Sequence, residues 1–258
     1  MRVGILADIH GNLPALQACW RELESLGTDI TVCLGDLVQY GPYPSEVIDF
    51  VRDHGIASLQ GNCDRAVARS RSSTGDRFES TFWETMATEA LAWTTDTLGR
   101  EGAAFLRRLP QEIRLEADRV KVLCVHGLPG NITGELPEPP AGSVADHLLD
   151  SGSCRVLLAG HTHRMSLASR PSGMLVNPGS VGGGTLPGQA TMAVLDVDES
   201  GVPSISWHRV GYDMDPYERK FRHEGLPETF LKCIKYGRDP RGGWHVDDII
   251  WRHKWAEH

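Results

Sequence analysis

The sequence lacks the features of a membrane protein, of a disulfide-stabilised secreted protein and of a general nucleic-acid-binding protein. No run approaches the roughly 20 apolar residues that a membrane helix requires, and the short apolar run after Arg2 is not flanked as a signal peptide would be. The six cysteines are dispersed, with no CxxC pair, which predicts reduced thiols and a cytoplasmic location. Lys and Arg number 26 against 34 Asp and Glu, and the net charge of −8 argues against broad contact with nucleic acid. A small phosphorylated substrate is compatible with this charge.

The length and the hydrophobic content predict one domain that spans residues 1–258. At 258 residues with 40% hydrophobic residues, the chain can bury a single large core. Apolar runs and helical periodicity alternate near the N-terminus, which predicts strands at 3–7, 30–34 and 57–60 and helices at 13–26 and 45–53. Further strands are expected at 112–115, 120–125, 155–159, 174–176, 190–197 and 203–210, with a helix at 144–149. The predicted fold class is therefore α/β (α+β).

Two helical segments are predicted outside this core. Between about 65 and 110, helix-forming residues without strand-like alternation predict two or three helices inserted as a cap. Residues from about 213 to 258 are expected to form a helical C-terminal extension. Its tryptophans (Trp244, Trp251 and Trp255) either seal the core or cover a second copy of the chain, so a homodimer stays open.

Short polar clusters follow the predicted strands. They are Asp8-Ile9-His10, Gly35-Asp36, Gly61-Asn62-Cys63-Asp64, His126-Gly127 and Gly160-His161-Thr162-His163. An open α/β sheet builds its sites at the carboxyl ends of its strands, so residues far apart in the sequence are expected to converge. Residues two apart in an extended segment point the same way, so His161 and His163 are expected to face a common centre, as Asp8 and His10 are.

The residue types in these clusters predict a site for divalent metal ions. Carboxylates, imidazoles and one amide oxygen suit Mn²⁺, Fe²⁺, Co²⁺, Ni²⁺ or Zn²⁺ better than Ca²⁺, with Mn²⁺ as the favoured candidate. Two ions roughly 3.5–4 Å apart need a bridging carboxylate, and Asp36 at the end of the second strand is the natural candidate. A hydroxide shared by both ions would then attack phosphorus in line, and no protein nucleophile is required. The residues expected to take part in catalysis are His10, Asp36, Asn62 and His126.

The ordered set D-x-H, G-D, G-N-x-D, H-G and G-H-T-H resembles the calcineurin-like metallophosphoesterase superfamily over residues 1 to about 210. The resemblance implies a four-layer α/β/β/α sandwich of two mixed sheets packed face to face. It also implies two groups of metal ligands bridged by Asp36: Asp8, His10 and His163 for the first ion, and Asn62, His126 and His161 for the second.

One departure from the family pattern bears on the substrate. Many phosphomonoesterases of the superfamily carry a histidine after the motif's asparagine, proposed to protonate the leaving oxygen, whereas this chain has Cys63. A thiol with an ordinary pKa near 8.5 is a poor general acid at neutral pH. The Gly-Asn-Cys-Asp sequence resembles the small bacterial and archaeal phosphodiesterase branch, so we expect a phosphodiesterase that acts on a small phosphoester. The alternatives are a phosphomonoesterase, a Ser/Thr protein phosphatase, or a non-catalytic metal-binding scaffold, which the intact ligand set disfavours.

Overall fold

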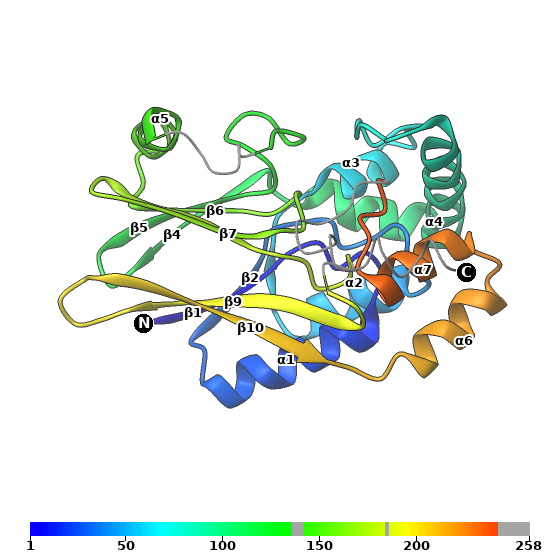
Figure 1. Cartoon of the computed structure of the whole chain (residues 1–258), viewed down its shortest axis with the longest axis horizontal. Coiled ribbons are helices and arrows are strands. Elements are labelled where there is room, and N and C mark those ends of the chain that lie inside the picture. The colour runs from blue at the N-terminus through cyan, green and yellow to red at the C-terminus, as the bar shows by residue number, and fades with distance from the viewer. Residues whose placement is uncertain (136–141, 184–185, 242–258) are drawn as a thin grey trace, which may run out of the picture.

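Two mixed sheets form the centre of the molecule (Figure 1). The computed structural model describes residues 1–135, 142–183 and 186–241. The first sheet has the order β10 (Pro203–Gly211), β9 (Gln189–Val197), β1 (Arg2–Leu6), β2 (Ile30–Cys33) and β3 (Ala57–Ser58). The second has the order β4 (Glu112–Ala117), β5 (Val120–Val125), β6 (Val156–Ala159), β8 (Gly173–Pro178) and β7 (Met165–Arg170).

Each sheet combines a parallel centre with antiparallel outer strands. In the first sheet β1, β2 and β3 run parallel, and β9 joins β1 antiparallel. In the second sheet β5, β6 and β8 run parallel, and β4 and β7 close the two edges antiparallel. The carboxyl ends of the parallel strands therefore meet at one edge of each sheet, which is where polar residues from different strands can converge.

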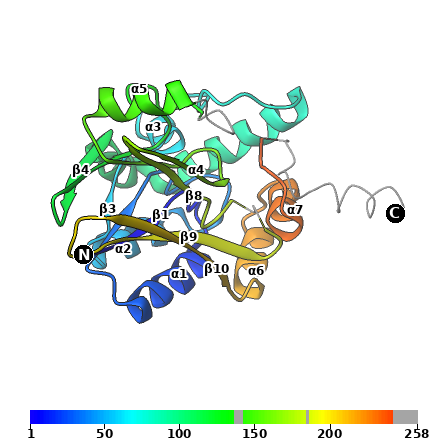
Figure 2. The same ribbon diagram turned by 60° about the vertical axis from the view of Figure 1, so that its left-hand side comes forward.

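Side chains that alternate along the strands build the layers. On β1, Val3 and Ile5 lie in a buried cluster that also contains Val122 and Cys124 of β5, so this cluster fills the space between the sheets. The intervening residues of β5, such as Leu123, face α5 (Gly142–Gly152) instead. Helices α1 (Leu13–Leu26) and α2 (Pro44–Asp53) cover the outer face of the first sheet. Figure 2 shows α5 and α1 on opposite sides of the paired sheets, which confirms the predicted four-layer arrangement.

Helix α1 has the bounds that its sequence predicts. The Asn12 side chain accepts a hydrogen bond from the backbone N–H of Ala15, at 3.2 Å, and Pro14 lies in the first turn. The helix ends at Gly27, whose φ of 67° is in the left-handed region.

The predicted insertion contains helices α3 (Asn62–Ala68) and α4 (Thr81–Arg108), and α4 has a break at Gly99. The described part of the C-terminal extension forms α6 (Asp215–His223) and α7 (Glu228–Tyr236), which pack their aromatic residues against the first half of α4 and against Cys63. The description of the chain as one domain with a cap and an extension stays a prediction. The three tail tryptophans lie outside the described residues, so the homodimer is also untested.

Strand β7 was missed by the sequence prediction. Its residues include two serines and an arginine, and none of the six is buried, so it carries little hydrophobic signal. None of the described helices is both long enough and apolar enough to cross a membrane.

Candidate metal centre

All seven predicted ligands gather where the strands of the two sheets end. Asp8 follows β1 and Asp36 follows β2, while His126 and His161 follow β5 and β6. Asn62 begins α3, after β3, and His163 precedes β7. Each of the seven is at most 4% exposed. The convergence expected from the strand ends is therefore present.

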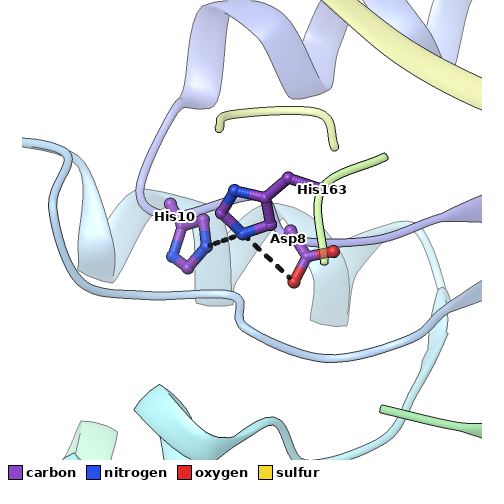
Figure 3. A group of neighbouring side chains, drawn as sticks. All are labelled: Asp8, His10 and His163. Carbon is purple, nitrogen blue, oxygen red and sulfur yellow. Dashed lines mark hydrogen bonds and ion pairs between the residues drawn. The ribbon is translucent and has the colours of Figure 1, made fainter. Parts of the chain in front are cut away.

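Asp8, His10 and His163 form one compact group (Figure 3). The Nε2 atoms of His10 and His163 are 3.0 Å apart, and His163 Nε2 lies 3.6 Å from Asp8 Oδ1. Two ligand atoms that each lie about 2.1 Å from a shared ion are separated by roughly 3 Å, so this spacing fits a common cation.

A second group contains Asp36, His126 and His161. His126 Nε2 lies 2.8 Å from Asn62 Oδ1 and 3.4 Å from Asp36 Oδ2, which adds Asn62 to this group. The same Asp36 oxygen is 3.9 Å from His10 Nε2 in the first group. Asp36 therefore lies between the two groups.

Five of the seven residues have left-handed backbone conformations, with φ of 53° at Asp8, 47° at His10, 54° at Asp36, 68° at His161 and 59° at His163. The premise that these segments are extended was wrong. His161 and His163 belong to different groups, with His163 beside Asp8 and His10, and His161 beside Asp36 and His126. Non-glycine residues rarely adopt this conformation, and it is concentrated at functional sites.

Backbone contacts orient the ligands. The Nδ1 of His126 lies 2.7 Å from the carbonyl oxygen of Leu34 and donates to it, which directs Nε2 into the site. The backbone N–H of Cys63 donates to Asp36 Oδ1 at 2.9 Å. A Cβ atom at Gly61 would lie 2.0 Å from that same oxygen, so only glycine fits there.

The site concentrates buried carboxyl groups. Burial, together with the neighbouring Asp36, raises the pKa of Asp8 well above its usual range and that of Asp64 to about 7. Burial opposes ionisation of Asp36 too, but the nearby His126 and His10 hold its pKa well below the usual range. Such a group of buried carboxylates calls for cations.

The two histidines of the second group differ in charge. Burial would lower the pKa of His126, but Asp36 and Asp8 raise it to about 10. Burial, with the neighbouring His126 and Arg241, lowers the pKa of His161 to about 3. His161 is therefore a neutral imidazole, the form that binds a metal. The donor atoms, their spacing and the charge together fit divalent cations.

Asp76 lies beside this centre and was missed by the sequence prediction. It comes from the loop between α3 and α4, and its Oδ1 is 3.9 Å from His161 Nε2. A lone acid in a polar loop carries no sequence signal that separates it from a surface residue. A cleft of about 410 Å³ opens next to it and is lined by Gly75, Asp76, Arg77, Asn131, Thr133, Glu135 and His161.

The comparison with known families agrees with this geometry. The family model of the calcineurin-like phosphoesterase superfamily domain matches residues 1–200 of the 258. The chain belongs to this superfamily. The resemblance drawn from the five motifs is confirmed. Membership in the family supports hydrolysis of phosphoesters and the binding of divalent metals, while the ligand role of each residue stays a prediction.

Similar proteins cover nearly the whole chain. An uncharacterized protein of Methanocaldococcus jannaschii is 26% identical over 255 residues, which are 92% of this chain and 98% of the relative. Among solved structures, a hypothetical protein from Pyrococcus horikoshii OT3 is 28% identical, with a TM-score of 0.79, 92% of this chain covered and 99% of the other. A metallophosphoesterase from Sphaerobacter thermophilus is also 28% identical, with a TM-score of 0.67, and the match again covers 92% of this chain and 99% of the other. The similarity therefore extends beyond residue 200 into the C-terminal helices.

Proposed function

We propose that this protein is a phosphodiesterase that holds two divalent metal ions, with Mn²⁺ as the favoured candidate. The observation that supports two ions is the position of Asp36. Its Oδ2 lies 3.9 Å from His10 Nε2 in the first group and 3.4 Å from His126 Nε2 in the second, so one carboxylate is within reach of both sets of ligands. In two-metal sites the ions usually lie about 3.5–4 Å apart, and a carboxylate within reach of both can bridge them.

When bound, the two ions supply Lewis acidity and an acidified water that can act as the nucleophile. The protein's own residues hold the geometry. Asp8, His10 and His163 form one half of the site, and Asn62, His126 and His161 the other. Because every one of these side chains is buried and several are fixed by backbone contacts, little reorganisation is needed when a phosphoester binds.

The preference for diesters rests on Cys63. Its side chain is 1% exposed and packs in the cluster with Tyr40 and α7, next to His10 and Asp36. Burial and the nearby Asp36 raise the pKa of this thiol well above its usual range. The thiol is therefore a still weaker acid than a free cysteine, and it is poorly suited to protonate a leaving oxygen. Substrates whose leaving group needs no such help are favoured.

The cleft beside His161 supports a small, polar substrate. Its lining carries both charges, from Arg77 and Glu135, and hydrogen-bonding groups from Asn131 and Thr133. The second ester substituent would occupy this cleft. The positive charge of Arg77 would attract the negatively charged substrate toward the adjacent metal centre.

The proposal is tested by removing bound metal and restoring Mn²⁺, Fe²⁺, Co²⁺, Ni²⁺ or Zn²⁺ singly. Turnover of bis(p-nitrophenyl) phosphate is then compared with that of p-nitrophenyl phosphate. We expect activity only after metal is restored, with the diester hydrolysed faster. Faster turnover of the monoester would overturn the diester preference, and failure to hydrolyse either ester would favour a metal-binding scaffold.

We also infer a cytoplasmic location, which is supported by the cysteines. All six are free thiols, and five of them are buried. Such a pattern is typical of a reducing compartment.

A further inference from the structure

Asp76 has an unusual position for an acid in a polar loop. The loop between α3 and α4 carries mainly serine, threonine, glycine and arginine, yet the Asp76 side chain is only 4% exposed. An ionisable group is seldom buried unless its oxygens have partners. The partners of Asp76 therefore indicate what it does.

One carboxylate oxygen of Asp76 has two donors. Asn62 Nδ2 donates to Asp76 Oδ2 at 3.0 Å, and Thr74 Oγ1 donates to the same oxygen at 2.6 Å. The carbonyl oxygen of Thr74 lies 3.5 Å from Asn62 Nδ2 as well. The loop thus presents only acceptors to the amide of Asn62.

This arrangement decides which way the Asn62 amide points. Asp76 Oδ2 and the carbonyl oxygen of Thr74 both lie on the side of the Asn62 Nδ2 atom, so the NH₂ group of Asn62 faces the loop. The amide oxygen then turns to the opposite side, where it lies 2.8 Å from His126 Nε2. Only this orientation places an oxygen, rather than an NH₂ group, among the donor atoms of the second group.

We propose that Asp76 is a positioning residue that fixes the Asn62 amide with its oxygen toward the second metal ion. This inference rests on the proposed two-ion function. It gives the inserted segment a defined part in the site, because the loop that supplies Asp76 and Thr74 belongs to that segment.

A direct ligand role for Asp76 agrees less well with the geometry. None of the three groups of mutually close His, Cys, Asp and Glu ligand atoms among the described residues includes it. Its short contacts are to Asn62 and Thr74, and the first of these is a predicted ligand.

The test is a titration of the full-length protein with Mn²⁺ alone, which gives the number of ions bound and the affinity for each. Asp76→Ala should bind the first ion as the wild type does and the second 10- to 100-fold more weakly, in the range of about 10–100 known for residues that orient ligands. Asp76→Asn keeps an oxygen that can accept from Asn62, so its affinity should lie nearer the wild type. Glu79→Ala removes an exposed acid from the same loop and should change neither affinity.

A double-mutant cycle separates positioning from direct binding. If Asp76 acts through Asn62, the Asp76→Ala/Asn62→Ala protein should bind Mn²⁺ as Asn62→Ala does. An additional loss in the double variant, or wild-type affinity for both ions in Asp76→Ala, would overturn the inference.

Failure of the proposed function gives a different result. A wild-type protein that binds fewer than two Mn²⁺ ions contradicts the two-ion proposal. The role of Asp76 is then read from neutron crystal structures, which distinguish the amide oxygen from the NH₂ group. An Asn62 amide that turns in Asp76→Ala supports the role, and one that keeps its orientation overturns it. Circular dichroism checks that each variant folds.

Discussion

The Asp64 carboxylate accepts a hydrogen bond from the backbone N–H of Leu37 at 2.9 Å. The same oxygen accepts from the N–H of Val38 at 3.3 Å, and the other oxygen accepts from Gly61 at 3.0 Å. One buried side chain thus joins the loop after β2, which carries Asp36, to the start of α3, which carries Asn62. Asp64 therefore holds two parts of the candidate metal centre in register.

Replacing Asp64 should destabilise the fold. Asp64→Ala leaves three buried N–H groups without this acceptor, and one unsatisfied buried group costs about 1–3 kcal/mol. Burial of the acid in the wild type also costs some stability, so we expect the free energy of unfolding to fall by about 3 kcal/mol. Urea unfolding in the presence of a chelator measures this change. Asp64→Asn keeps one oxygen and should lose less, and Asp53→Ala, at an exposed position, should stay within about 0.5 kcal/mol of the wild type. Equal stability of Asp64→Ala and the wild type would contradict this role.

Asp36→Asn should reduce hydrolysis of both test esters at least about 100-fold, because a neutral amide is a weaker ligand for either ion. Metal content measured by mass spectrometry after desalting should fall in parallel. If the variant keeps two ions and full activity, Asp36 does not bridge them.

Cys63→His should raise turnover of the monoester relative to the diester. The substitution introduces an imidazole, with an ordinary pKa near 6.5, at the position where a thiol is a poor acid. The ratio of kcat/KM for the two p-nitrophenyl esters is the measurement, and Cys63→Ser is the matched control without an effective acid. An unchanged ratio in Cys63→His would remove the missing proton donor as the reason for the diester preference.

Metal binding should release protons at pH 8. After metal removal, His126 carries a proton, since Asp36 and Asp8 overcome the effect of burial and raise its pKa to about 10. Because this proton is held more tightly in the folded protein than in the unfolded chain, it stabilises the folded state. The stabilisation is complete below the ordinary histidine pKa of about 6.5 and is lost as the pH rises through about 10. A metal needs the neutral imidazole, so its binding must displace this proton.

Calorimetry in HEPES and in Tris measures the release, because the two buffers differ in ionisation enthalpy. The binding enthalpies at pH 8 should differ by the value for at least one proton. A binding enthalpy that is the same in both buffers would contradict the charge assigned to His126.

Four of the residues that sequence reasoning found have positions that follow from strand ends. Asp8, Asp36, His126 and His161 each come directly after a buried strand, so the sheet topology alone brings them together. Asp76 could not be found in this way. Its burial results from a loop that folds back onto Asn62, which is a tertiary contact without a local pattern.

Local geometry was harder to predict than position. His161 and His163 were expected to face one centre because extended backbone was assumed, whereas both residues have left-handed backbone and lie in different groups. Strand β7 was missed because none of its residues is buried and its serines and arginine give no hydrophobic alternation.

The left-handed backbone at five of the ligands has a consequence for how this protein would evolve. Each such residue costs stability, of order 1–3 kcal/mol, that a glycine at the same place would recover. In a population selected for heat resistance alone, glycine should therefore spread first at these five positions. Selection for metal binding would oppose that drift, so stability and the metal centre would make opposing demands on these five positions.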